Sequence, residues 1–371
     1  MPVTYDAIVV GLGAMGSAAA CHLARRGMRV LGLDRFTPPH AFGSSHGETR
    51  IIREAYFEHP VYVPMVQRAY ELWRDLEHQS DTTLLRETGG VMIGRPDSDL
   101  VQGARHSAEL HGLRHEMLTA VGVHERFPAL HPENDMVAVW EPRAGVLFAD
   151  ACVSAHLGQA QRYGAELRYK ESVVRWEPDG DDIRVLATQG EYRARQLIVT
   201  AGAWNSSLFP ELPLGVERQV LFWFDHASAP EVLTPERCPV HLWQFDGRRF
   251  FYGFPDLGNG VKAAFHHGGE ITTVDTVRRD VAAAEVEDIR AVLRRLLPAA
   301  DGNLRASTVC VYTNTPDEHF LIDRHPAHSQ VRIVSACSGH GFKFAPVIGE
   351  ILADLAQGRP PRFDLDLFRW R

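Results

Sequence analysis

The alternation of apolar and polar positions gives the two ends of the chain one pattern and the middle another. Residues 5–10 and 29–34 are short, nearly continuous apolar runs, which is typical of parallel strands buried on both faces. Between them, apolar residues recur at helical spacing over 15–26, and Gly27 follows as a helix C-cap. The opening is therefore predicted to fold as strand, glycine turn, helix and strand.

Further elements are predicted along the first half of the remaining chain. Residues 63–76 are expected to form a helix with many polar positions. Apolar runs bounded by turn residues predict four short strands, at 166–169, 173–177, 183–187 and 196–200.

The middle of the chain, from 219 to 265, has short aromatic and β-branched runs separated by Gly, Pro, Asn and Asp, which indicates an antiparallel sheet. An amphipathic helix is predicted at 281–297. The pattern of the opening then returns, with a buried strand at 331–335, a glycine turn and a helix at 346–356.

A GxGxxG motif at residues 11–16 joins the first predicted strand to the first predicted helix. Gly11 permits the tight turn, Gly13 lets the backbone approach a pyrophosphate, and Gly16 allows close contact between helix and strand. Asp34 ends the next strand, where it can accept hydrogen bonds from ribose hydroxyls and disfavours a 2′-phosphate. This context predicts a dinucleotide site, and a glycine-rich turn without a ligand is the plainer alternative.

The rest of the chain favours FAD over NAD. An NAD dehydrogenase usually continues with further strand–helix–strand units, whereas an irregular stretch beginning at Pro38 and Pro39 follows here. Residues 197–202 form a late apolar strand ending in a small-residue turn, a pattern with which many flavoproteins return to the dinucleotide domain. FAD is therefore the expected cofactor.

These patterns predict an α/β fold (α+β overall) with two closely connected domains. A Rossmann-like FAD-binding domain with a parallel sheet is expected, with a mainly antiparallel substrate and catalytic domain inserted into it. The expected boundaries are 1–82, 146–210 and 322–371 for the FAD-binding domain, and 83–145 and 211–321 for the substrate domain.

Composition narrows the possible functions. The formal net charge is -8 and no run of Lys or Arg stands out, so no nucleic-acid partner is expected. Five scattered cysteines without metal-ligand spacing indicate a reducing compartment without a disulfide framework. We expect a cytoplasmic protein without a signal peptide, a membrane partner or a metal site.

Several blocks of sequence carry a more specific signal than the glycine loop. They are Pro38-Pro39-His40, GSSHGETRIIR at 43–53, YGFP at 252–255, Cys310, TPDEHF at 315–320 and SGHGFKF at 338–344. In this order they resemble the family of monomeric sarcosine oxidase and N-methyltryptophan oxidase, within the D-amino-acid-oxidase-like flavoproteins. The resemblance covers nearly the whole chain.

The resemblance implies that FAD is bound covalently through Cys310, whose plainer interpretation is a small buried hydrophobe in a strand. It also implies that Arg53 and Lys343 bind the substrate carboxylate, which suits a guanidinium fork and an ammonium. The alternative for Arg50 and Arg53 is an i,i+3 pair on a helix face, held by acids such as Glu48.

By the same resemblance, Lys262 lies on one flavin face, where a buried cation promotes oxygen reduction. Its plainer interpretation is an outward-facing lysine on a strand. His266 matches a histidine near the substrate amine, Tyr252 an active-site hydroxyl, and Arg50 a residue near the flavin. No carboxylate or cysteine is spaced so as to complete a metal site with the two adjacent histidines.

The turn containing Gly339, His340 and Gly341 is expected to contact the cofactor, together with Lys343. If the last helix begins near residue 345, successive backbone N–H groups point out of this turn and would stabilise an anionic reduced flavin. The alternative is an ordinary connection between a strand and a helix.

The expected activity is the oxidation of a small secondary amino acid, N-methyl or cyclic, such as sarcosine, with O2 as acceptor. The products are an imine, hydrolysed to amine and aldehyde, and hydrogen peroxide. The expected partners are the amino acid and O2, and the family indicates a monomer. The alternatives are an FAD-dependent dehydrogenase that reduces a protein or quinone, and a non-catalytic FAD- or NAD-binding protein.

Two departures from the family pattern bear on the substrate. Phe57 stands where relatives typically carry glycine, and the stretch 243–245, which begins with Trp243, is bulkier than its counterpart. Both are expected near the substrate pocket. Residues 43–47 also fit the GxSxG motif of hydrolases, but no apolar strand leads into them, so a serine hydrolase is not expected.

Overall fold

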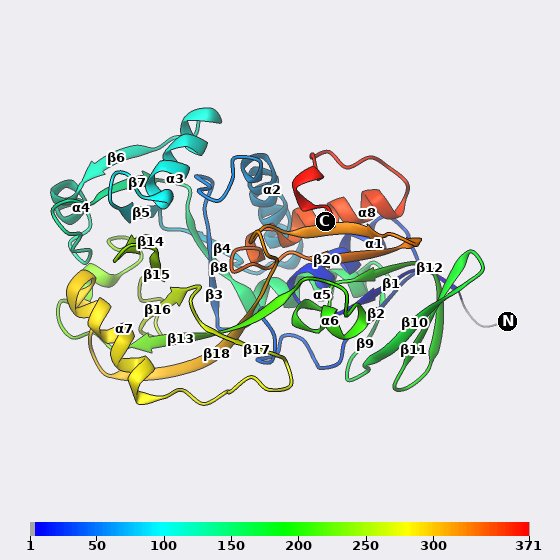
Figure 1. Cartoon of the computed structure of the whole chain (residues 1–371). Helices are drawn as coiled ribbons and strands as arrows, with labels where there is room; N and C mark the ends of the chain where they lie inside the picture. The colour runs from blue at the N-terminus through cyan, green and yellow to red at the C-terminus, as the bar shows by residue number, and fades with distance from the viewer. Residues whose placement is uncertain (1–3, 371) are drawn as a thin grey trace.

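The computed structural model describes residues 4–370, which form two large sheets and a small one (Figure 1). The first sheet has eight strands: β1 Thr4–Val10, β2 Val30–Leu33, β9 Glu166–Arg168, β10 Val173–Asp179, β11 Asp182–Ala187, β12 Glu191–Val199, β19 Leu321–His325 and β20 His328–Ser335. Strands β9, β2, β1, β12 and β20 run parallel in this order, while β10, β11 and β19 pair in antiparallel fashion.

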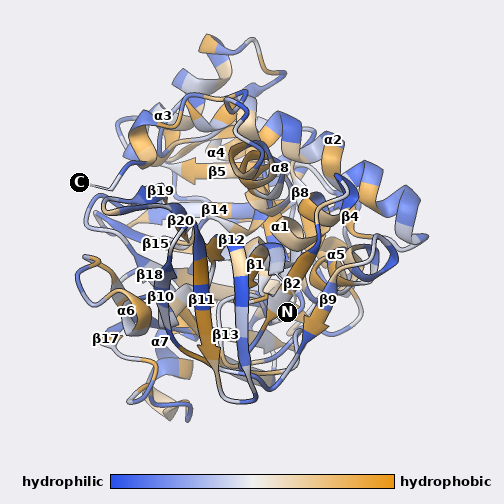
Figure 2. Ribbon diagram, turned by 90° about the vertical axis from the view of Figure 1, so that its right-hand side faces the viewer, coloured by the Kyte–Doolittle hydropathy of each residue, from blue (hydrophilic) through white to orange (hydrophobic). Residues whose placement is uncertain are grey.

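Helices cover this parallel core, whose strands β1 and β2 are buried on both faces, as their continuous apolar runs require. Helix α1 (Ala14–Arg25) packs between α5 (Ala149–Arg162) and α8 (Ala345–Ala356). Contact is close because Gly349 of α8 lies against the backbone of Ala18 in α1. Helix α2 (Tyr62–Ser80) lies beside α8, and its alternation of hydrophilic and hydrophobic residues is visible in Figure 2.

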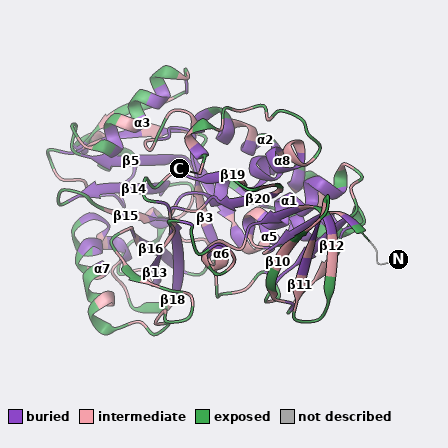
Figure 3. Ribbon diagram, turned by 45° about the vertical axis from the view of Figure 1, so that its right-hand side comes forward, coloured by how far each residue is buried: buried purple, intermediate pink, exposed green. Residues whose placement is uncertain are grey.

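The second sheet has nine strands: β5 Gly90–Gly94, β6 Glu116–Thr119, β7 Val137–Glu141, β13 Gly215–Phe224, β14 Val240–Phe245, β15 Arg249–Gly253, β16 Val261–His266, β17 Glu270–Thr272 and β18 Leu304–Asn314. Its pairs are antiparallel except for β5 with β14. Figure 3 shows that its central strands are buried, while α7 (Ala283–Leu296) covers the sheet and exposes its outer side.

A three-stranded sheet lies between the two large sheets: β3 Thr49–Ile52, β8 Gly145–Phe148 and β4 Leu85–Glu87. The other helices are α3 Asp99–Leu110, α4 Ala120–Arg126 and α6 Asn205–Leu208, with short 3-10 turns at Gly202–Trp204, Pro230–Leu233, Pro298–Ala300, Phe342–Phe344 and Asp366–Phe368.

The predicted α/β fold class is confirmed, and each strand and helix predicted from the pattern is present with its ends shifted by a few residues. The first sheet takes its strands from 4–33, 166–199 and 321–335, but the exact domain boundaries stay a prediction. The interpretation of Arg50 and Arg53 as a pair on a helix is wrong, because Arg50 lies in β3 and Arg53 follows it.

The contact between α1 and α8 gives a test of the fold. A Cβ atom at Gly349 would lie 2.7 Å from the backbone of Ala18, so we expect Gly349→Ala to destabilise the protein by about 1–3 kcal/mol. Gly158, in α5, has no atom within 4 Å of its Cβ position, so Gly158→Ala is expected to stabilise by about 0.5–1 kcal/mol. Urea denaturation of both variants measures the difference. Equal shifts would contradict this account of the packing.

Candidate active site

A long cavity begins at the carboxyl ends of β1, β2 and β12 and extends between the two large sheets. Gly11, Gly13 and Asp34 line its beginning. Its other end is lined by residues from separate parts of the chain: Arg50, Arg53, Tyr252, His266, Cys310, Tyr312, Gly339, His340, Gly341 and Lys343. The cavity therefore brings together nearly all of the site residues predicted from the sequence. Of the others, Gly16 lies behind the glycine loop and Lys262 behind the cavity wall.

The glycine loop has the geometry that its residues predicted. Gly11 has a φ of +85°, and a Cβ atom there would lie 2.7 Å from the carbonyl oxygen of Thr200. A Cβ at Gly16 would meet the backbone of Gly11 at 1.7 Å, so α1 can approach the loop only with glycine at this position. Ser45 closes the loop from the other side, where its hydroxyl accepts a hydrogen bond from the Ala14 N–H at 3.1 Å.

Asp34 is held at the end of β2 by its own surroundings. Its carboxylate accepts hydrogen bonds from the N–H groups of Leu12 and Phe36, each at 2.7 Å. Burial raises the pKa of this carboxyl, and the two hydrogen bonds oppose that rise. The side chain thus braces the glycine loop, and it lines the cavity where a ribose would lie.

The residues along the cavity fit a dinucleotide. Glycine at positions 11 and 13 leaves the backbone bare beside the cavity, and α1 begins at Ala14 with its N-terminus facing it. The cavity then passes β18, where the buried Cys310 thiol faces it. Arg50 Nη2 lies 3.7 Å from Cys310 Sγ. Burial raises the pKa of this thiol, and the nearby guanidinium opposes the rise.

Arg50 organises the loop beside Cys310. Its guanidinium donates to the carbonyl oxygens of Ser44, His46 and Thr49, each at 2.7 Å. These contacts hold the loop 43–47 against β3. No helix follows this loop, because β3 does, so it lacks the strand–turn–helix context of a hydrolase nucleophile elbow.

Lys262, in β16, is buried rather than outward-facing, so the plainer interpretation of this residue is wrong. Its ammonium donates to the carbonyl oxygens of Gly47 at 2.6 Å and Thr49 at 2.8 Å. The ring of Phe254, which lines the cavity, lies 4.8 Å from the ammonium. Burial and the cation of Arg50 lower the pKa of Lys262 well below its ordinary value.

Arg53 already has a carboxylate partner, Glu58, which no sequence motif predicted. Arg53 Nη2 donates to both carboxylate oxygens of Glu58 at 2.7 Å. Burial alone would raise the pKa of Glu58, but the neighbouring groups, with Arg53 first and Lys343 among them, together outweigh burial, and the pKa lies below its ordinary value. The rings of Tyr56 and Phe57 flank the guanidinium at 4.3 and 4.9 Å. The only sign of this pair in the sequence is that Glu58 follows Arg53 by five residues.

Lys343 lies in the 3-10 turn before α8 and is also buried. Its ammonium donates to neutral oxygens, the His340 carbonyl at 2.6 Å and the Tyr56 hydroxyl at 3.3 Å. Burial, with the nearby cation of Arg53, lowers the pKa of Lys343 to about 7. The chain has three lysines, and two of them are therefore buried beside this cavity.

Two histidines near the cavity are neutral. His340 Nδ1 lies 2.6 Å from the Tyr56 hydroxyl, and its Nε2 lies 3.0 Å from the Glu318 carbonyl, so the proton is on Nε2. Burial lowers the pKa of His340 to about 3 and that of His266 well below its ordinary value. His266 Nδ1 lies 3.2 Å from the hydroxyl of Tyr312, a second residue that no sequence motif predicted.

The turn before α8 differs in one respect from the expectation. Helix α8 begins at Ala345 as predicted, but the N–H groups of His340 and Gly341 both donate to the carbonyl of Cys337. These two amides are therefore engaged within the turn instead of pointing out of it.

The two departures from the family pattern lie outside the cavity lining. Trp243 faces the core on the far side of the second sheet, stacked on Phe251, while Leu242 faces the cavity. The expectation that the 243–245 stretch approaches the pocket is therefore wrong. Phe57 stacks on Phe250 with ring centroids 5.8 Å apart, and acts on the site through its contact with Arg53.

The glycine loop, the parallel sheet and the charged inner end of the cavity define a dinucleotide-dependent oxidoreductase. Residues 6–355 match the family described as FAD dependent oxidoreductase (DAO), and the chain belongs to this family. FAD is therefore its cofactor. Among residues 4–370, no helix is long and apolar enough to cross a membrane, and no cluster of three or more potential metal ligands is present.

Comparison with known proteins gives close full-length relatives. The chain is 46% identical to a monomeric sarcosine oxidase of Streptomyces avermitilis over 362 residues, covering 96% of this chain and 94% of that protein. It is 35% identical to an N-methyl-L-tryptophan oxidase of Citrobacter koseri over 367 residues, covering 98% of each. The open form of NikD, an amino acid oxidase, has a similar fold, with a TM-score of 0.86 at 24% identity over 99% of this chain and 97% of NikD.

The glycine loop gives a test of the cofactor site. Gly11→Ala places a methyl group against Thr200 on a backbone with positive φ, so we expect the purified variant to carry much less FAD per chain than the unmodified protein. Gly27→Ala is the matched control, because Gly27 also has positive φ but its Cβ position is open. Absorbance of the purified variants measures FAD per chain. A Gly11→Ala protein that keeps full FAD content would show that the loop does not hold the cofactor.

Proposed function

We propose that the protein oxidises a small secondary amino acid, such as sarcosine or another N-methyl amino acid, with O2 as electron acceptor. The observation that carries this proposal is the set of buried cations at the inner end of the FAD cavity, beside the neutral His266. The relatives named as sarcosine oxidase and N-methyl-L-tryptophan oxidase support it, and the first of these names supports a monomer.

Arg53 and Lys343 would bind the substrate carboxylate. The Lys343 ammonium contacts two neutral oxygens, so a substrate carboxylate would bring it a counter-charge in a buried site. Glu58 shields Arg53 until substrate arrives, and a carboxylate that contacts both cations must share or replace Glu58. A substrate carboxylate that replaces Glu58 exchanges one carboxylate for another and buries no extra charge.

The amine of the substrate must be neutral before it can lose a hydride equivalent. FAD, when bound, supplies the two-electron acceptor. His266 and Tyr312, joined by a contact of 3.2 Å, offer an acceptor and a hydroxyl for an amine at the inner end of the cavity. The cations of Arg53 and Lys343 disfavour a further positive charge nearby, so they favour the neutral form of the substrate amine.

Cys310 would attach the cofactor covalently, because its thiol is buried, faces the cavity and lies beside the Arg50 guanidinium. The sulfur would bond to a methyl carbon of the flavin ring, with loss of one proton from the thiol and one from the methyl group, and O2 would accept the two electrons released. If so, acid precipitation should leave the yellow colour in the pellet, and Cys310→Ala should release it to the supernatant. Cys337→Ala, nearby, is the control and should not. Colour released from the unmodified protein would exclude a covalent link.

Lys262 would promote the reaction with O2, because a buried cation stabilises the negative charge that develops on oxygen. We expect Lys262→Met to slow reoxidation by O2 about 10²-fold or more, with little effect on anaerobic reduction by sarcosine. The control is Lys170→Met, because Lys170 is exposed. Stopped-flow absorbance separates the two half-reactions. Equal slowing of both half-reactions would contradict this role of Lys262. Reduced FAD that is stable in air in the unmodified enzyme would instead favour a dehydrogenase.

A further inference from the structure

A buried carboxylate, Glu217, lies next to the active site and is separated from its His266 by one residue, His267. Glu217, in β13, is 4% exposed and accepts four hydrogen bonds. Oε1 accepts from the Gly269 N–H at 2.7 Å and from Gln219 at 2.8 Å, and Oε2 accepts from Asn314 at 2.6 Å. The fourth contact, at 3.3 Å, is to Nδ1 of His267. Such a donor set holds the carboxylate in its ionised form.

His267 connects this carboxylate to the cavity. Its backbone has a φ of +62°, which is unusual for a residue with a side chain and turns the chain sharply at the end of β16. The turn places the His267 ring 4.3 Å from the His266 ring and 5.4 Å from the Tyr312 ring, centroid to centroid. Both neighbours line the cavity. The order in space is thus Glu217, His267, then His266 and Tyr312.

The surroundings of His267 favour its cation. Burial opposes the charge, but the contact with Glu217 and the nearby carboxylates of Glu318 and Glu58 raise the pKa of His267 above its ordinary value. His266 faces the opposite situation. Burial comes first, and the cations around it are His267, Arg53 and Lys343. The neutral His340 is also nearby, and the hydroxyl of Tyr312 lies on the other side of the ring.

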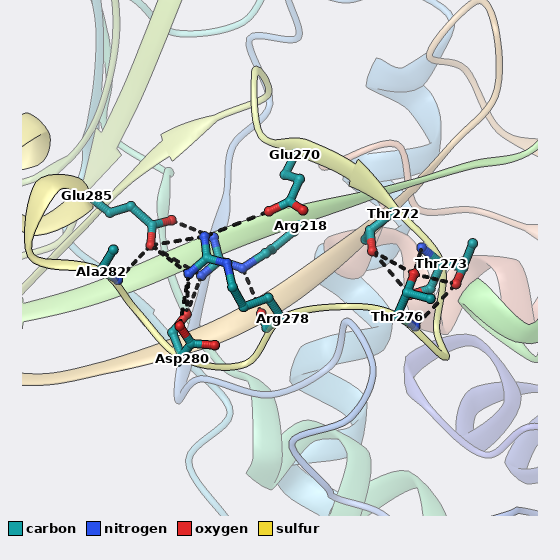
Figure 4. A network of polar contacts seen from close by, with 9 residues as sticks. All are labelled: Arg218, Glu270, Thr272, Thr273, Thr276, Arg278, Asp280, Ala282 and Glu285. Atoms are coloured by element: carbon teal, nitrogen blue, oxygen red, sulfur yellow. Dashed lines mark hydrogen bonds and ion pairs between the residues drawn. The ribbon is translucent and has the colours of Figure 1, made fainter.

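Neighbouring structure fixes this arrangement. Arg218, the next residue in β13, donates to the carbonyls of Arg278 and Asp280 and pairs with Glu285, as Figure 4 shows. Arg278 pairs in turn with Glu270, the first residue of β17. A Cβ atom at Gly269 would lie 1.9 Å from the Arg218 carbonyl, so the turn is pressed against β13.

We propose that His267, held as a cation by Glu217, is a positioning residue that adds to burial in keeping His266 neutral and so lowers the pH above which the enzyme oxidises its amine substrate. The kinetic consequence rests on the proposed function, whereas the charge of His267 does not depend on it. Two imidazolium rings at this distance repel each other, so a charged His267 withholds the proton from His266. Glu217 supplies the counter-charge that keeps the half-buried His267 charged.

The first measurement uses no turnover. In the FAD-loaded enzyme with histidine labelled by ¹³C at Cε1, the NMR signal of His267, assigned from its loss in His267→Gln, should titrate above the ordinary histidine midpoint. Glu217→Gln should lower that midpoint by about one pH unit or more. A midpoint that is ordinary and unmoved by Glu217→Gln would overturn the proposal, even if the enzyme oxidises sarcosine.

The second measurement follows the pH profile of anaerobic FAD reduction by sarcosine. His267→Gln should shift the acid limb up by about one unit, because His266 then keeps its proton more easily, and His267→Lys should restore the limb. The control is His226→Gln, which should leave the profile unchanged. His226 also has a carboxylate partner, Asp256 at 2.6 Å, but it does not line the cavity. An acid limb unmoved in His267→Gln would overturn the proposal. Failure of sarcosine and of other N-methyl and cyclic amino acids to reduce FAD would contradict the proposed function and leave the NMR result to decide on His267.

Discussion

The position of the cofactor cavity depends on one close contact, between the turn that follows β1 and the end of β12. Neither Gly11 nor Gly16 has room for a Cβ atom there, because Thr200 and the turn itself fill the space. This contact fixes where α1 begins and therefore where its N-terminus faces the cavity. Strand β12 also pairs with β20, so the same contact helps to position β20 and the turn and helix α8 that follow it.

A second constraint is the cost of burying charge at the far end of the cavity. Arg50 and Lys262 are satisfied by backbone carbonyls, whereas Arg53 is paired with Glu58. Buried positive charge that no carboxylate balances would destabilise the site without a ligand, and an anionic ligand would remove this cost. The lowered pKa of Lys343 expresses the same balance, because this ammonium gives up its proton more readily than an exposed one.

Local patterns predicted many of the strands and helices and the residue types of the site, but not the pairings between distant segments. The glycine loop and the apolar strands were recognisable because their signals are short and contiguous. The strands and helices between 83 and 162 were missed, and the parallel pairing of β5 with β14 joins segments far apart in the chain. Trp243 was misplaced because strand alternation turns Leu242, its neighbour, toward the cavity. Glu58 and Tyr312 belong to no motif, so only the folded chain places them at the site.

The burial of two of the three lysines also affects the surface of the protein. Lys170 is the one exposed lysine among residues 4–370, and the other positive charges of the described surface are carried mainly by arginine. Oxidation of an N-methyl group would release formaldehyde, which condenses with primary amines. The formaldehyde made by such an enzyme would meet a single accessible lysine amine on its described surface. The surface therefore offers few sites at which this aldehyde could cross-link the protein.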